Sequence, residues 1–202
     1  NDKDIEEYHN IGKAIKKSEK YSYVNGTQLM DHGSRIYDVA GYRLPSVTTV
    51  LGKTKDQKFL KDWTAKVGEQ EATRIKNVSS ARGTAMHKFL EHYILGTGYD
   101  DLTGLGQEAK SMAEKVIEIG LAPVEEYYGS EVTMYYPGLY AGSTDLVCSH
   151  NGEDTIVDFK QANRPKKKEW IEDYYLQIAA YAMAHDYVHN SAINKGVIMV
   201  CT

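Results

Sequence analysis

Residues 139–161 read LYAGSTDLVCSHNGEDTIVDFKQ, with Asn151-Gly152 between two stretches in which apolar and polar residues alternate. An Asn-Gly pair in this setting is a strong short-range indication of a tight β-hairpin, because both residues tolerate the left-handed backbone conformation that the turn requires. We therefore predict two antiparallel strands, Leu139–Ser149 and Thr155–Gln161, joined at this turn.

Counting outward in step from a two-residue turn places Asp145 directly opposite Asp158. Directly opposed residues on antiparallel strands share one face of the sheet, with Cβ atoms about 5 Å apart. Lys160 follows two positions after Asp158 and shares that face, whereas Val157 and Phe159 point to the other side, into the core. A slip of one residue would reverse these faces, so the arrangement depends on the type of turn.

Two carboxylates at this separation repel each other by roughly 3 kcal/mol at an effective dielectric constant of about 20. A proton shared between them can offset the repulsion, and so can a hard divalent cation such as Mg²⁺. Asp145 and Asp158 lie in mid-strand among apolar residues, where a buried charge is costly without a function. The ammonium of Lys160 suits a place beside a metal-bound water or a phosphate. A surface patch with an ordinary salt bridge is the alternative.

The periodicity of the flanking sequence changes on either side of this hairpin. Gly129–Tyr135 alternates and predicts a third strand of the meander, ended by the Pro137-Gly138 turn, and Gly196–Cys201 predicts a last apolar strand. The predicted helices, in chain order, are 55–76, Ser79–Leu95 closed by Gly96, 106–120 ending at Gly120, and 168–185. This order predicts an α/β fold with a central mixed sheet flanked by helices and a helical N-terminal half.

The beginning of the chain carries two further patterns. Residues 1–20 mix acidic and basic side chains without an apolar segment, which predicts a polar helix or a loose arm and no signal or transit peptide. Residues 21–50 are rich in Tyr, Val and Gly and predict short strands or a hairpin. Pro45-Ser46-Val47-Thr48 predicts a helix start. We therefore divide the chain into an arm with short strands, 1–43, and a main domain, 44–202.

The composition of the 202 residues, 42% hydrophobic and 26% charged, is typical of a soluble globular protein, and the expected location is the cytoplasm. Cys148 and Cys201 sit in apolar runs and are expected to be buried, reduced thiols. Two cysteines are too few for the four thiolates of an iron–sulfur cluster. The net charge of −4 argues weakly against a nucleic-acid binder, but five bases and no acid occupy the nine residues Lys160–Lys168.

Two pairs of residues one helical turn apart lie outside the hairpin. His87 follows the small residues of Arg82-Gly83-Thr84-Ala85-Met86, which permit close approach of another element, and Glu91 shares its helix face. Gln177 and Tyr181 share a face of the helix that follows the hairpin. Taken alone, each pair indicates an ordinary packed or solvent-facing helix surface.

Taken together, these motifs resemble the PD-(D/E)XK nuclease superfamily, and more closely its RecB-like exonuclease branch, which includes mitochondrial and phage exonucleases. That branch carries, in order, a small-residue turn leading to His, then Glu, Gly-x-x-Asp, Asp-x-Lys and Gln-x-x-x-Tyr. The matching motifs are Gly83 to His87, Glu131, Gly142-Ser-Thr-Asp145, Asp158-Phe-Lys160 and Gln177 to Tyr181. The segment from Pro45 to Leu51, with Trp63 and Gly68 after it, is similar to the N-terminal helical part of those enzymes. The resemblance covers about residues 44–200 and implies a restriction-endonuclease-like core.

By this resemblance, the chain would be a metal-dependent deoxyribonuclease that hydrolyses phosphodiester bonds. The implied metal is Mg²⁺ or Mn²⁺, held by His87, Asp145, Asp158 and the Phe159 carbonyl. Lys160 would orient or activate the attacking water. Glu131 matches a catalytic motif position and would make a water-mediated or second-metal contact. The chain departs from the iron–sulfur members of the branch, since it lacks four cysteines.

The substrate implied by the resemblance is DNA. Gln177 and Tyr181 would support the site or contact the substrate backbone, and the other candidate substrate-binding residues are Arg82, Arg164, Lys166, Lys167 and Lys168. Such bases would hold phosphates in a salt-dependent manner. The 16 tyrosines, against three Phe and two Trp, offer stacking surfaces for single-stranded bases.

The expected activity is an exonuclease that acts on strand ends and prefers single strands. The long helical segment before the core strands includes His87, so it must pack over the metal site, where it could form a passage too narrow for duplex. Two alternatives stay open: a recombination exonuclease for duplex ends, and a nucleic-acid-binding module that has kept the fold without cutting. The intact Asp145, Asp158 and Lys160 disfavour the second, because such a module does not need them.

Overall fold

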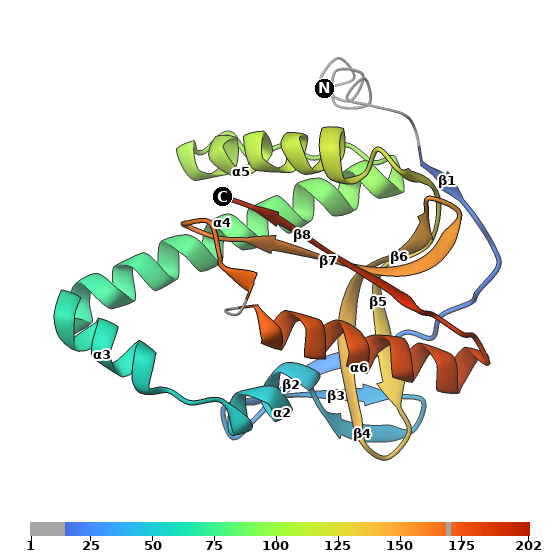
Figure 1. Ribbon diagram of the computed structural model, residues 1–202, viewed down its shortest axis with the longest axis horizontal. Coiled ribbons are helices and arrows are strands. Elements are labelled where there is room, and N and C mark those ends of the chain that lie inside the picture. The colour runs from blue at the N-terminus through green and yellow to red at the C-terminus, as the bar shows by residue number, and fades with distance from the viewer. Residues whose placement is uncertain (1–14, 169–170) are drawn as a thin grey trace.

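The computed structural model describes residues 15–168 and 171–202 (Figure 1). Its central sheet has five strands in the spatial order β1-β5-β6-β7-β8. These strands are β1 (Lys16–Lys17), β5 (Val124–Tyr136), β6 (Tyr140–His150), β7 (Glu153–Gln161) and β8 (Lys195–Cys201). β5, β6 and β7 form an antiparallel meander, while β1 and β8 run parallel to their neighbours at the two edges. The α/β fold with a central mixed sheet is therefore confirmed.

The hairpin between β6 and β7 has the predicted turn and register. Asn151 and Gly152 have φ values of 50° and 81°, the left-handed conformation of a type I′ turn. The pairing of β6 with β7 runs from His150↔Glu153 to Leu146↔Val157, in step with the count outward from the turn. At the next position the Asp145 carboxylate Oδ2 accepts a hydrogen bond of 2.7 Å from the Phe159 N–H. A hydrogen bond to a side chain thus replaces the backbone hydrogen bonds of the β-ladder where the two strands diverge.

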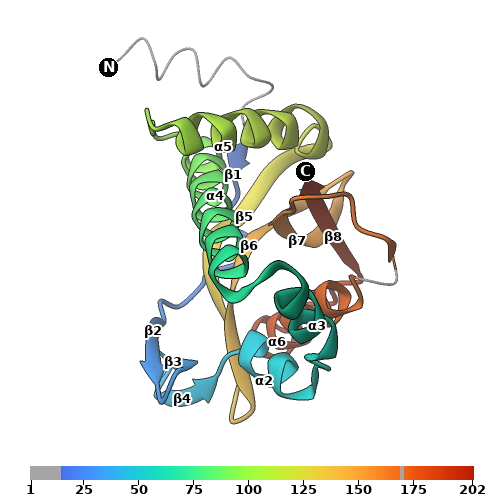
Figure 2. The same ribbon diagram turned by 90° about the vertical axis from the view of Figure 1, so that its left-hand side faces the viewer.

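Helices cover both faces of this sheet (Figures 1 and 2). α4 (Glu69–Leu95) and α5 (Gly104–Lys115), which continues into the π-helical turn η1 (Val116–Gly120), pack on one face, and α6 (Glu172–His189) packs on the other. The alternation of the strands explains this division, because Val157 and Phe159 enter the core under α4 and Ile156 enters the core under α6. The intervening Asp158 is left near the point where strands and helices meet.

The short strands predicted within residues 21–50 are present, but residues 16–17, predicted as part of a polar helix or loose arm, instead pair with β5 as the edge strand β1. β2 (Thr27–Asp31), β3 (Ser34–Val39) and β4 (Tyr42–Pro45) form a separate antiparallel sheet. α2 (Val47–Thr54) begins after Ser46, whose side chain accepts a hydrogen bond of 3.0 Å from the Thr49 N–H. The expectation of an arm before residue 15 lies outside the described residues.

Several helix boundaries differ from the predictions. The helix predicted over 55–76 is interrupted at Gly68, whose φ of 88° ends α3 (Lys58–Val67) and forces a change of direction before α4. The helix predicted to begin at Ser79 begins at Glu69, so the last part of the first predicted helix and the whole of the second form one continuous helix. The last helix begins at Glu172 rather than near residue 168. The predicted end at Leu95 is confirmed, because Gly96 adopts the left-handed conformation, whereas the last helix continues to His189 rather than ending at His185.

Two further sequence expectations can be compared with the described residues. Cys148 and Cys201 are buried and make no disulfide, as expected. No described helix combines the length and the apolar character needed to cross a membrane.

A buried histidine joins α6 to the segment before β2. His185 is fully buried, the Tyr23 hydroxyl lies 2.8 Å from its Nε2, and the Ser191 hydroxyl lies 2.6 Å from its Nδ1. Because Ser191 donates its own proton to Asp186, it accepts from His185 Nδ1, which leaves Nε2 to accept from Tyr23. The ring is therefore neutral in this setting.

Acid should destabilise the protein through this histidine. Burial lowers the pKa of His185 from 6.5 to about 4. The unfolded chain takes up a proton on His185 near pH 6.5, whereas the folded protein accepts this proton only near pH 4. The free energy of unfolding is therefore highest above pH 6.5 and falls by up to about 3 kcal/mol as the pH drops from 6.5 to 4. Urea unfolding at several pH values would measure the loss. His185→Gln should reduce this pH dependence, whereas His32→Gln, at an exposed position, should leave it unchanged; equal pH dependence in all three proteins would contradict the assignment.

Candidate active site

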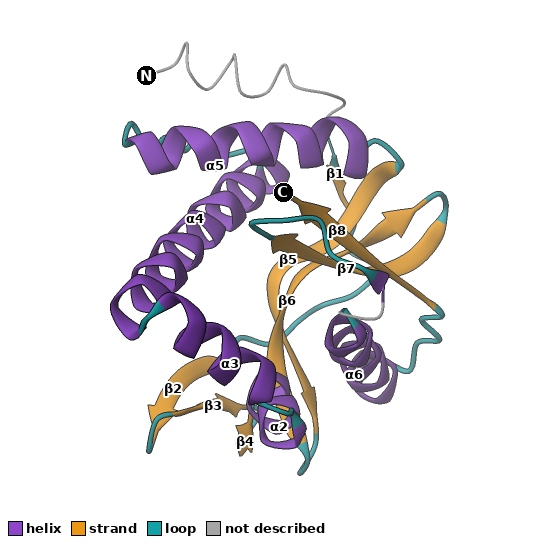
Figure 3. Cartoon of the chain, turned by 60° about the vertical axis from the view of Figure 1, so that its left-hand side comes forward, coloured by secondary structure: helices purple, strands orange, loops and turns teal. Residues whose placement is uncertain are grey.

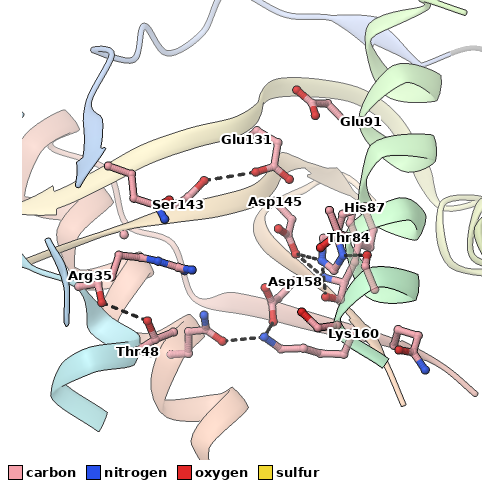
Figure 4. A pocket seen from close by; sticks show the side chains of 18 of the residues that line it. Arg35, Thr48, Thr84, His87, Glu91, Glu131, Ser143, Asp145, Asp158 and Lys160 are labelled. Atoms are coloured by element: carbon pink, nitrogen blue, oxygen red, sulfur yellow. Dashed lines mark hydrogen bonds and ion pairs between the residues drawn. The ribbon is translucent and has the colours of Figure 1, made fainter. Parts of the chain in front are cut away.

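A cavity of about 740 Å³ lies where the small sheet, α2, α4, α6 and the diverging ends of β5, β6 and β7 meet (Figure 4). Most of the residues singled out in the sequence line it, although they come from distant parts of the chain. These residues are His87, Glu131, Asp145, Asp158, Phe159, Lys160, Gln177 and Tyr181. The tertiary structure therefore brings the five motifs together in one pocket.

Asp145 and Asp158 face each other at the floor of this pocket. Burial raises the pKa of Asp158, and the charge of Asp145 raises it further, to about 7. Burial would also raise the pKa of Asp145, but the hydrogen bond and charge of His87 outweigh burial and lower it. One carboxyl is thus poised to hold a proton while the other stays ionised. A proton shared by the two carboxylates is one of the two ways, given in the sequence analysis, to offset the repulsion between Asp145 and Asp158.

His87 reaches the aspartates from α4. Its Nδ1 lies 2.7 Å from the Gly83 carbonyl, and its Nε2 lies 2.8 Å from the Phe159 carbonyl and 3.3 Å from Asp145 Oδ2. Burial lowers the pKa of His87, yet the adjacent Asp145 outweighs burial and raises it to about 9. The imidazole therefore donates from both nitrogens. A Cβ at Gly83, on the same helix face, would lie 3.8 Å from the Gln161 side chain, an ordinary van der Waals contact, so the packing of α4 against the end of β7 does not require glycine there.

Lys160 stands on the opposite side of Asp158. Its Nζ lies 2.8 Å from Asp158 Oδ2 and donates a hydrogen bond of 2.9 Å to Gln177 Oε1 (Figure 4). Gln177 in turn donates from Nε2 to the Tyr181 hydroxyl at 3.0 Å. The two α6 residues of the Gln-x-x-x-Tyr motif thus form a chain of hydrogen bonds that ends on the ammonium. In this structure they support the lysine.

Glu131 occupies a strained position in the pocket wall. Its φ of 50° lies in the left-handed region, which costs a non-glycine residue about 1–2 kcal/mol. The register of β5 and β6 sets it opposite Asp145, and its Oε2 accepts a hydrogen bond of 3.3 Å from Ser143. Its protein surroundings raise the pKa of Glu131 by desolvation, and the charge of Asp145 raises it further, to about 7. The side chain is accessible from the pocket, so a substrate or an ion can reach it.

The other basic residues singled out in the sequence do not line the pocket. Arg82 lies beside it on α4, where its guanidinium pairs with Glu108 at 3.3 Å and donates to Asn163. The exposed segment after β7 carries the remaining four, Arg164, Lys166, Lys167 and Lys168. The run of bases that begins at Lys160 is therefore divided, because β7 holds Lys160 inside while the segment after Gln161 leaves the sheet.

Some pocket residues gave no indication in the sequence. Gln28 and Arg35 come from the small sheet, Thr48 comes from the first turn of α2, and Lys88 comes from α4. Figure 4 shows the Arg35 side chain extending toward the carboxylates. No motif spacing links Arg35 to the hairpin. Arg35 lies in the alternating segment Arg35–Val39, before the helix start at Pro45, and this position alone does not predict a place in the pocket.

The donor set around Asp145 suits a hard divalent cation. It combines one imidazole nitrogen, two carboxylates and the Phe159 carbonyl, and ligand atoms about 2.1 Å from an octahedral ion lie roughly 3 Å from one another. The separations of His87 Nε2 from the Phe159 carbonyl and from Asp145, 2.8 and 3.3 Å, match that spacing. The buried Asp158 Oδ2 lies close to Lys160 but accepts no well-aligned hydrogen bond.

In this structure the candidate ligand atoms contact one another directly. Within residues 15–168 and 171–202, no three His, Cys, Asp or Glu side chains stand ready as a metal cage. A cation would have to replace the hydrogen bonds that His87 makes to the Phe159 carbonyl and Asp145. The residue types therefore fit such an ion, while in this structure they hydrogen-bond to one another.

Comparison with known proteins gives two distant relatives. No family model matches the chain. It is 26% identical over 181 residues to mitochondrial genome maintenance exonuclease 1 of Xenopus tropicalis, covering 80% of this chain and 49% of that protein. It is 26% identical over 170 residues to mitochondrial genome maintenance exonuclease 1 of Mus musculus, covering 78% of this chain and 49% of that protein. The chain therefore spans about half the length of the curated relatives it matches, and their names support a nuclease function.

Proposed function

We propose that the chain is a metal-dependent DNA exonuclease that hydrolyses phosphodiester bonds from strand ends and prefers single strands. The observation that carries this proposal is the meeting of Asp145, Asp158 and Lys160 with His87 in one open pocket. A pair of carboxylates next to an ammonium can hold a cation, a water molecule and a phosphate in one place. The distant relatives named as exonucleases support the same class of reaction.

Each residue has a role that follows from its position. His87, Asp145, Asp158 and the Phe159 carbonyl would hold Mg²⁺ or Mn²⁺. When bound, such a cation polarises a phosphate oxygen and lowers the pKa of a bound water. Lys160, held 2.8 Å from Asp158, stabilises negative charge on the attacking oxygen or on the phosphate.

The remaining pocket side chains position the substrate. Gln177 and Tyr181 hold Lys160 in place through their hydrogen bonds. The positively charged Arg35 side chain lines the pocket from the small sheet. Its guanidinium can pair there with a neighbouring phosphate of the DNA strand. Glu131, across from Asp145, can accept a hydrogen bond from water or contact a second ion. The exposed bases Arg164, Lys166, Lys167 and Lys168 would add a salt-dependent attraction for DNA.

The preference for free single-stranded ends rests on the walls of the pocket. α2, α4 and the small sheet line it opposite the strands of the central sheet. In Figure 3 the run from α4 through α3 to α2 curves away from the central sheet and returns to it. A strand that reaches the carboxylates enters a pocket lined by α2, α4 and the small sheet as well as by β5, β6 and β7, and a flexible single strand fits such a pocket more readily than a stiff duplex.

The direct test uses labelled oligonucleotides with Mg²⁺, Mn²⁺ or EDTA. We expect stepwise shortening of single-stranded DNA with either metal, no cleavage with EDTA, and slower degradation of blunt duplex. Parallel substrates blocked at the 5′ or the 3′ end would give the polarity. Cleavage that persists in EDTA would contradict the metal dependence, and binding without cleavage under every metal condition would favour a non-cutting module.

A further inference from the structure

The ammonium of Lys160 has more N–H donors than there are oxygen acceptors next to it. An ammonium group carries three N–H donors. Gln177 Oε1 accepts a hydrogen bond of 2.9 Å from one of them, and Asp158 Oδ2 lies 2.8 Å from Nζ on a second side as an ion-pair partner. On a further side lies the ring of Tyr174, whose centroid is 4.8 Å from Lys160 Nζ. Tyr174 belongs to the first turn of α6 and to none of the motifs singled out in the sequence.

This separation is that of a cation–π contact. A cation within about 6 Å of an aromatic centroid is attracted by the negative face of the ring, and the attraction grows when the pair is shielded from water. The Lys160 side chain is only 22% exposed, so the ring acts on a partly desolvated charge. A ring face is also a weaker acceptor than an oxygen atom. It can fix the position of the ammonium without engaging the N–H on that side in a strong hydrogen bond.

We propose that Tyr174 is a positioning residue for Lys160, an inference that rests on the proposed nuclease function. The long lysine side chain loses much rotamer freedom when it is fixed. Tyr174 and Gln177, three positions apart on α6, fix it from one helix face. The ring excludes bulk water from the third side of the ammonium. An N–H donor on this side is thereby kept for the oxygen of the attacking water or of the phosphate, which displaces the ring as the stronger acceptor.

The experiment compares substitutions at position 174 with a matched substitution next to it. Tyr174→Phe keeps the ring and Tyr174→Leu removes it, whereas Tyr175→Leu removes an exposed ring one position further along the same helix. We expect Tyr174→Leu to lower kcat for single-stranded DNA about tenfold with KM within about twofold, while Tyr174→Phe and Tyr175→Leu keep the wild-type values. Equal kcat in Tyr174→Leu and wild type, or a loss that Tyr174→Phe does not rescue, would overturn the proposal.

A second series guards against a folding defect in Tyr174→Leu. Phenylalanine with one, two or three ring fluorines at position 174 keeps the size of the side chain while weakening the negative face of the ring. If the ring holds the ammonium, kcat should fall step by step with the number of fluorines, whereas a ring that serves only for packing would give the same kcat throughout.

A spectroscopic readout separates this inference from the nuclease function itself. The ring current of Tyr174 should shift the ε-methylene protons of Lys160 upfield in the NMR spectrum of lysine-labelled protein. The shift should persist in Tyr174→Phe and Tyr175→Leu and disappear in Tyr174→Leu. A wild-type protein without any such shifted lysine would overturn the inference. A wild type that shows the shift but cleaves no DNA would instead overturn the proposed function.

Discussion

Asp158→Asn and Lys160→Ala should both reduce DNA cleavage by about a thousandfold or more, but only Asp158→Asn should weaken the binding of Mn²⁺. Asp158 is a candidate ligand, and asparagine keeps its shape while removing its charge. Lys160 cannot bind a cation, because its ammonium has donors and no acceptor. Its loss removes charge stabilisation at the reacting atoms and leaves the carboxylates in place. Cleavage of a labelled single strand and calorimetric titration with Mn²⁺ would measure the two effects separately.

Asp154→Asn provides the matched control for these variants. Asp154 lies on the same strand and sheet face as Asp158 but outside the pocket, where it pairs with Lys20 at 2.8 Å and accepts hydrogen bonds from Tyr21 and Tyr128. It should retain cleavage and Mn²⁺ affinity despite some loss of stability. Weaker Mn²⁺ binding in Lys160→Ala would contradict the role given to the lysine. Full activity of Asp158→Asn would show that the catalytic centre lies elsewhere.

A covalently closed single-stranded circle should be degraded at least about a hundredfold more slowly than the linear strand of the same sequence. An internal phosphate that cannot be threaded into the pocket cannot reach the attack position, and a misplacement of about 1 Å can already cost that factor. The comparison needs only a gel-based time course with Mg²⁺ on the two substrates.

The control for the circle is the same molecule opened by a single cut. Opening should restore the full rate, since it changes nothing except the presence of ends. Circles and linear strands that disappear at equal rates would show internal entry, and the expectation of threading would be wrong. A circle that is bound tightly but not cut would support the need for an end at the catalytic carboxylates.

Much of the fold follows from local patterns, which the sequence by itself determines. The left-handed preference of Asn151 and Gly152 sets the turn, the turn sets the register of β6 and β7, and strict alternation then decides which residues share a face. For this reason Asp145, Asp158 and Lys160 could be grouped without a structure. Ser46 and Gly96 similarly mark helix ends, because capping depends on neighbours within one turn of the helix.

The rest depends on contacts between residues that are far apart in the chain, which only the tertiary structure decided. The packing of α4 on the sheet brings His87 to the Phe159 carbonyl, and the small sheet brings Arg35 into the same pocket. The contact of Tyr174 with Lys160 depends on where α6 begins. Neither the periodicity nor the turns of the sequence predict these distances, because the distances depend on how side chains of separate elements pack against one another.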